Sequence, residues 1–129
     1  MRKIIGLWLT SLLLLSTLAG QSGDILRMEA NLHQLGNSKN KVDTLNELAW
    51  LYYWDAMPTR LEKAYAHAIK GQQLAQQIKY DKGLSDSYMR LGLIAEGNLD
   101  FEQAEQYYKE AIELRKKFST KVNLSLIHI

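Results

Sequence analysis

The chain contains no cysteine and only one proline among its 129 residues. The absence of thiols excludes a disulfide framework, a cysteine-ligated zinc site and lipid attachment through an N-terminal cysteine. The fold must therefore be stabilised by packing. The single proline, Pro58, lies between two stretches of helical pattern and precedes the start of the second.

Motifs that carry catalysis are also missing. His33 and His67 lie far apart without HExxH spacing, the glycines form no phosphate-binding loop, and no serine lies in a nucleophile elbow. Four carboxylates share one predicted helix and indicate its solvated face: Glu102, Glu105, Glu110 and Glu113. The sequence predicts no catalytic, cofactor-binding or metal-binding residue, so enzymatic activity would need a further domain.

Residues 1–19 have the pattern of a secretory signal peptide. Arg2 and Lys3 precede an apolar run, IIGLWLTSLLLL, and small residues near Ala19 provide a cleavage site. We therefore expect an exported protein, in the periplasm or another extracytoplasmic space. The alternative is an uncleaved membrane anchor, although the run is short against the roughly 20 apolar residues of a membrane-spanning helix.

The charge balance argues against nucleic acid as a partner. The chain has 16 basic and 14 acidic residues, and loss of Arg2 and Lys3 with the leader would leave equal numbers of each. The only basic run, residues 115–117, is expected in the last turn of a helix, where cations offset the helix dipole. A membrane is expected to matter only through the leader or a segment beyond this chain.

The strongest pattern begins at Tyr88. Together with Leu91, Gly92 and Ala95 it forms a stripe at i, i+3, i+4 and i+7 on one helical face. The small residues of this stripe permit close approach of a second helix, which follows a break at residues 97–100. The second helix has its own apolar face, made of Ala104, Tyr108, Ala111 and Leu114. The pattern predicts two packed helices joined by a short turn.

The same stripe occurs 43 positions earlier, which indicates an internal repeat. Its residues are Leu45, Leu48, Ala49 and Tyr52. The partner helix of this first copy follows Pro58 and has a face of small and apolar residues: Ala64, Ala68, Gly71, Ala75 and Ile78. The connection between the two helices is three residues longer than in the second copy, and we place the extra residues in the loop of residues 54–57.

Polar residues mark where the helices should begin. Asp100 and Thr59 each precede a glutamine or glutamate by three residues, which is the spacing of a capping box. Residues 24–35 have apolar side chains at roughly helical spacing and predict a short leading helix. A polar break follows, and Asn40 is the expected cap of the next helix.

These features resemble the tetratricopeptide repeat, a helix-turn-helix unit of about 34 residues that stacks into a superhelix. The residues that carry the resemblance are Tyr88, Leu91, Gly92, Asp100, Phe101, Ala104, Tyr108 and Ala111. Ala95 and Lys116 depart from the family pattern, in which an aromatic residue and a proline are usual. The resemblance implies an all-α solenoid of two repeats plus a leading helix, and we expect it to be truncated. With the leader, the expected segments are a signal peptide (1–19), a leading helix and linker (20–40), a divergent repeat (41–80), a second repeat (81–118) and a truncated end (119–129).

An exported leader, a short helix and then repeats also resemble the N-terminal extracytoplasmic region of certain bacterial sensor histidine kinases and regulators. That resemblance implies a protein-interaction or sensory module in a longer signalling protein. The alternative is a free-standing periplasmic scaffold or assembly protein built from the same repeats. The two differ downstream, because a sensor needs a membrane span and a signalling domain, whereas a scaffold adds repeats.

In this family the first helix of each pair lines a concave groove that binds a peptide or partner protein. The candidate groove residues carried over by position are Asn46, Trp50, Tyr53, Trp54, Asp86, Met89, Arg90 and Leu93. Three of them are aromatic at i, i+3 and i+4 and suit an anchor pocket. The alternative is that these aromatic residues pack on the leading helix around Met28, Leu32 and Leu35.

The end of the chain departs from the repeat pattern. The last six residues, LSLIHI, resemble the in-frame translation of a transposase adaptor used in sequencing libraries, so we do not expect residues 124–129, His128 among them, to be native. The alternative is a native apolar tail. The outer face of the last helix, with Tyr107, Ile112 and Leu114, is expected to be open to a further repeat or to self-association.

Overall fold

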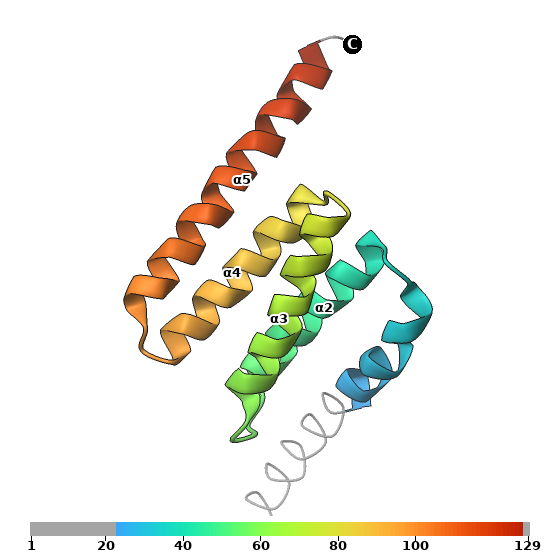
Figure 1. Cartoon of the computed structure of the whole chain (residues 1–129), viewed down its shortest axis with the longest axis vertical. Helices are drawn as coiled ribbons and strands as arrows, with labels where there is room; N and C mark the ends of the chain where they lie inside the picture. Colours follow the sequence, from blue (N-terminus) through green and yellow to red (C-terminus); the bar gives the residue numbers. More distant parts are fainter. Residues whose placement is uncertain (1–22, 128–129) are drawn as a thin grey trace, which may run out of the picture.

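The computed structural model describes residues 23–127, with side chains up to Lys121, and all regular structure in this range is helical (Figure 1). A helix over residues 23–31 precedes the following elements: η1 (Leu32–Leu35), α2 (Lys39–Tyr53), α3 (Arg60–Gln77), α4 (Asp81–Gly97) and α5 (Phe101–Ile127). The predicted all-α class is confirmed. The predicted signal peptide (1–19) and His128 lie outside the described residues.

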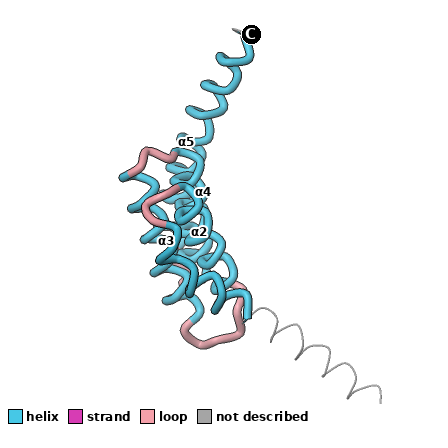
Figure 2. Tube along the Cα trace, turned by 90° about the vertical axis from the view of Figure 1, so that its right-hand side faces the viewer, coloured by secondary structure: helices cyan, strands magenta, loops and turns pink. Residues whose placement is uncertain are grey.

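Successive helices pack in chain order and run in alternating directions (Figure 1). α2 also contacts α4, so the first helices of the two pairs are neighbours. This is the arrangement of a helical-repeat solenoid. α5 has 27 residues against 17 in α4, and its C-terminal part projects beyond the other helices (Figure 2).

The turns that end α3 and α4 share one backbone geometry. Lys79 and Leu99 adopt left-handed φ angles of 56° and 62°. In both turns the following residue donates its N–H to the carbonyl five residues earlier, at 2.9 Å. This bond is the mark of a Schellman-type helix end, which satisfies carbonyls that the helix leaves free. The same kind of helix end thus forms both the turn between the two helix pairs, after α3, and the turn within the second pair, after α4.

The two helix pairs differ in their internal connection. Residues 54–59 join α2 to α3 and residues 98–100 join α4 to α5. The first connection is three residues longer, as predicted. Asp100 caps α5 as predicted, because its Oδ1 accepts the N–H of Gln103 at 3.1 Å. Thr59 makes no side-chain bond at the start of α3, so that capping prediction is wrong.

The predicted cap of α2 is also wrong. α2 begins before Asn40, and its cap is Ser38, whose Oγ accepts the N–H of Lys41 at 3.2 Å. The Ser38 hydroxyl donates in turn to the carbonyl of Leu35 at 2.7 Å, which ties the end of η1 to the start of α2. Gly36 makes this sharp turn possible, because its φ of 60° lies in the region that side chains disfavour.

The interior is formed by the residues of the two stripes and their partner helices. Those that are buried are Leu45, Leu48, Ala49, Tyr52, Ala64, Ala68, Leu91, Gly92, Ala95, Ala104 and Ala111. Tyr88 and Tyr108 are half-buried. Ile25 of the helix over residues 23–31 joins this core at 5% exposure. The same helix is held by a hydrogen bond of 2.5 Å from the Tyr52 hydroxyl to Glu29.

A buried asparagine and a buried serine meet where α2, α3 and α4 come together. Asn46 is 4% exposed, donates its amide to the carbonyl of Gly83 at 3.0 Å, and accepts the hydroxyl of Ser87 at 2.8 Å. Gly71 of α3 leaves room for it, since a Cβ there would lie 2.9 Å from the Asn46 Oδ1. These hydrogen bonds join the first helix pair to the second.

We expect Asn46→Ala to lower the free energy of unfolding by about 2–3 kcal/mol, because it removes two buried hydrogen bonds and leaves a small cavity. Ser87→Ala should cost about 1 kcal/mol, since the Asn46 amide keeps its bond to Gly83. Urea denaturation followed by circular dichroism measures both. The double variant should cost less than the sum of the two, and simple additivity would contradict the shared network.

Gly92 permits a close contact between α4 and α5. A Cβ at Gly92 would lie 2.4 Å from the ring of Tyr108. A Cβ at Gly97 would meet the flexible end of Leu61 at 3.0 Å and the ring of Tyr53 at 3.4 Å, an ordinary van der Waals distance. An aromatic ring cannot yield as a leucine methyl can, so Gly92 is required by packing and Gly97 is not.

We therefore expect Gly92→Ala to lower the free energy of unfolding by a net ~1 kcal/mol or more, because overpacking outweighs the higher helix propensity of alanine. Gly97→Ala is the matched control and should leave stability unchanged or slightly raised. Thermal unfolding compares the two variants. Equal effects of both substitutions would show that the Tyr108 ring is not held against α4.

Candidate functional site

The aromatic residues at the end of α2 form one cluster. The rings of Trp50 and Trp54 meet edge to face with centroids 5.5 Å apart, and those of Tyr53 and Trp54 lie 5.0 Å apart. Trp54, which follows the last residue of α2, is 60% exposed. A large aromatic side chain held by its neighbours and open to solvent is suited to anchor a partner.

The cluster faces α4. The guanidinium carbon of Arg90 lies 4.6 Å from the centroid of the Trp50 ring, which is cation–π geometry. Tyr53 lies against Arg60 at the start of α3, with 5.3 Å from the guanidinium carbon to the ring centroid. Tyr53 packs on the same hydrophobic core as Met28 and Leu32 from the segment before α2. The ring contacts of Trp50 are with Trp54 and Arg90. A groove formed by these aromatic residues stays a prediction.

Arg90 is held at the groove in a half-buried state. Its Nε is buried without a hydrogen-bond partner among the described residues. Burial lowers the pKa of the Arg90 guanidinium, whereas the nearby carboxylates of Asp86 and Glu47 favour its charged form and Arg115 disfavours it. A cation with few fixed partners, stacked on an indole, leaves hydrogen-bonding capacity for a ligand.

Asp86, one turn before Arg90, belongs to a small ion network. Its carboxylate lies 3.8 Å from Lys82 and 3.7 Å from the guanidinium of Arg115 on α5. Arg115 also donates its Nε–H to Ser85 at 3.2 Å. The prediction that residues 115–117 end a helix is wrong, because α5 continues to Ile127 and Arg115 contacts α4 from the middle of the helix.

The structure divides the predicted groove residues into two groups. Asn46 does not line the groove, because its amide is buried between the helices and occupied by Gly83 and Ser87. Tyr53 supports Trp54 from the side. The remaining six residues are half-buried or exposed. We call this set the aromatic groove after the predicted groove, which stays a prediction: Trp50, Trp54, Asp86, Met89, Arg90 and Leu93. The sequence does not predict the contact of Arg115 with Asp86, because only tertiary packing brings the two residues together.

Further exposed apolar side chains lie just before α5 and along its N-terminal half. Leu99 is 76% exposed, Phe101 65% and Ile112 49%. Tyr107, predicted on the outer face, instead lies near Tyr88 of α4, with ring centroids 6.2 Å apart. Self-association through this helix stays a prediction.

Other kinds of site find no support within residues 23–127. No three histidine, aspartate or glutamate side chains of this range are grouped closely enough to hold a metal ion. None of the helices described there combines the length and the apolar character needed to span a membrane.

One curated relative links the chain to a protein of described role. Over 78 residues the chain is 33% identical to the photosystem I assembly protein Ycf3 of Cyanophora paradoxa. The match covers 58% of this chain and 44% of that relative, so the chain spans less than half of the relative's length. No protein-family model matches the sequence, and no solved structure shows significant similarity.

The contact between Arg90 and Trp50 can be measured as a coupling energy. We expect a double-mutant cycle of Arg90→Met and Trp50→Leu to give about 0.5–1 kcal/mol, the size of a partly desolvated cation–π pair. Urea unfolding of the four proteins supplies the values. Lys39→Met, on the first turn of α2, is the control and should show no coupling to Trp50→Leu. A coupling near zero for Arg90 would contradict the stacked arrangement.

Proposed function

We propose that the chain is a protein-interaction module of the tetratricopeptide type, which binds an extended segment of a partner protein in the aromatic groove. The observation that carries the proposal is the exposed Trp54 beside the stacked Trp50–Arg90 pair, on the face where α2 and α4 are neighbours. Tryptophan and arginine are the residues most enriched at binding hot spots.

The chemistry of the groove defines the partner segment. The indole rings suit an apolar or aromatic anchor side chain, and Met89 and Leu93 extend the apolar surface along α4. Asp86 and Arg90 offer one charge of each sign, so the groove suits a segment of mixed polarity. A clamp for a terminal carboxylate would need several cations and amides, and Arg90 is the one groove residue with that chemistry.

We favour an assembly or scaffolding role without catalysis. The curated relative is an assembly protein by name, which supports this role over the sensory role that the sequence resemblance implies. An extracytoplasmic location, with the leader of residues 1–19 removed, is part of the proposal and rests on the sequence pattern. An uncleaved leader that anchors the chain in a membrane is the alternative to removal of residues 1–19, and a longer signalling chain is the alternative to the assembly role. Self-association through α5 is a separate proposal.

Peptide display against the full chain tests the groove. We expect the selected peptides to carry an apolar anchor, and Trp54→Ala to weaken their binding at least about tenfold, as loss of a hot-spot residue does. Tyr65→Ala is the matched control, because Tyr65 is 47% exposed on α3 and lies outside the groove. Fluorescence anisotropy measures both affinities. Failure to select any peptide, or equal weakening by both variants, would contradict the proposal.

A further inference from the structure

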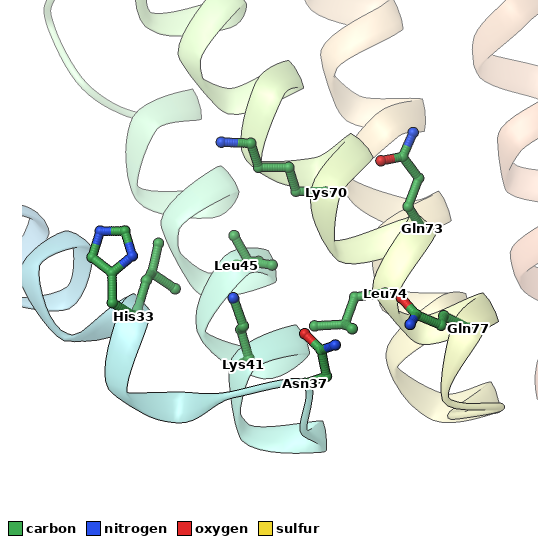
Figure 3. Close-up of a pocket in the computed structure, with 9 residues that line it drawn as sticks. His33, Asn37, Lys41, Leu45, Lys70, Gln73, Leu74 and Gln77 are labelled. Atoms are coloured by element: carbon green, nitrogen blue, oxygen red, sulfur yellow. The ribbon is translucent and has the colours of Figure 1, made fainter.

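A pocket of about 360 Å³ lies between η1, the turn after it, α2 and α3, and it shares no residue with the aromatic groove (Figure 3). Its position follows from the turn at Gly36, which sends the chain from η1 into α2 and leaves η1 facing the C-terminal half of α3. Pockets of this size are at the small end of those that bind small molecules.

The apolar part of the pocket is formed by three leucines from three elements. Leu45 of α2 and Leu74 of α3 belong to a hydrophobic cluster on which Leu32 of η1 packs. Leu45 is 2% exposed and Leu74 8%, so their side chains are fixed in the core. A rigid apolar wall of this kind can bury an alkyl chain at little entropic cost to the protein.

The polar part of the pocket carries only cations and neutral groups. Lys41 of α2, Lys70 of α3 and His33 of η1 are placed around the same opening (Figure 3). The other polar lining residues are the amides Asn37, Gln73 and Gln77, and no carboxylate lines the pocket. Neither lysine takes part in an ion pair with any residue that the structure describes. The pocket therefore has unbalanced positive charge beside an apolar wall.

This charge is not a general property of the repeat. When α3 is aligned with α5 by the buried Ala64 and Ala104, Glu110 takes the place of Lys70 and Glu113 that of Gln73. Both glutamates are exposed. Two equivalent surfaces thus have opposite charge, and only the one in the first pair borders the pocket.

We propose that this pocket binds a small monocarboxylate with an apolar tail. The carboxylate lies between the ammonium groups of Lys41 and Lys70, and the tail lies on the three leucines. Charge complementarity selects the anion, since a carboxylate supplies the ion-pair partner that neither lysine has among the described residues. The size of the pocket selects a small molecule, because a folded partner would bury a far larger surface.

Titration of the full chain with octanoate tests the proposal, with 1-octanol as the neutral analogue of equal chain length. In ¹H–¹⁵N spectra we expect octanoate to give saturable shifts at the amides of residues 32–45 and 70–77. We expect 1-octanol to bind at least about tenfold more weakly, because it cannot pair with the lysines. Absence of saturable shifts at these residues, or equal binding of the alcohol, would overturn the proposal.

A matched pair of variants separates pocket binding from general charge effects. Gln73→Glu places a carboxylate in the pocket, whereas Gln76→Glu makes the same change on the same helix outside it. Both positions are exposed, so both variants should fold. We expect Gln73→Glu to weaken octanoate binding at least about tenfold and Gln76→Glu to leave it within about twofold. Equal behaviour of the two variants would overturn the proposal, whatever the state of the aromatic groove.

Discussion

The stack depends on one buried amide. A buried asparagine is costly unless its donor and acceptor are both satisfied, and Asn46 finds these partners only where α4 brings Gly83 and Ser87 to it. Contacts between small apolar residues tolerate sliding, but this pair of hydrogen bonds does not. It therefore fixes the register of the two helix pairs. Trp50 follows Asn46 by one turn and Arg90 follows Ser87 by one turn, so the same register sets their stacking.

The first helix pair contributes residues to the pocket and to the aromatic groove. α2 is in contact with η1, α3 and α4, so different sides of this helix face different elements. Lys41 and Leu45, one turn apart, face the pocket, and Trp50 faces α4. The second pair contributes Arg90 and Asp86 to the groove and a long solvated helix. The pair that resembles the tetratricopeptide repeat less closely thus contributes the two tryptophans of the aromatic groove and most of the residues that line the pocket.

Local pattern was sufficient to predict the helices, their pairing and the longer first connection, because each depends on periodicity or on counting residues. It failed where the burial or contacts of a side chain depend on an element distant in the sequence. Asn46 occupies a groove position of the family, yet Ser87, 41 residues later, makes it an interior residue. The sequence pattern places Arg115 in the last turn of a helix, whereas α5 continues to Ile127. The pocket depends on how η1 faces α3, for which no local signal exists.

The buried amide is not repeated in the second pair. At the 43-residue offset Met89 takes the place of Asn46, and in the aligned partner helices Ala111 takes that of Gly71. If a copy of the first pair followed the second, the side chain of Met89 would lie at the junction where Asn46 lies now. Its thioether could not make the hydrogen bonds that the Asn46 amide makes. The two units are therefore not interchangeable, and growth of such an array by gene duplication would require new interface residues at every junction. The hydrogen bonds of Asn46 thus require that the second pair follow the first.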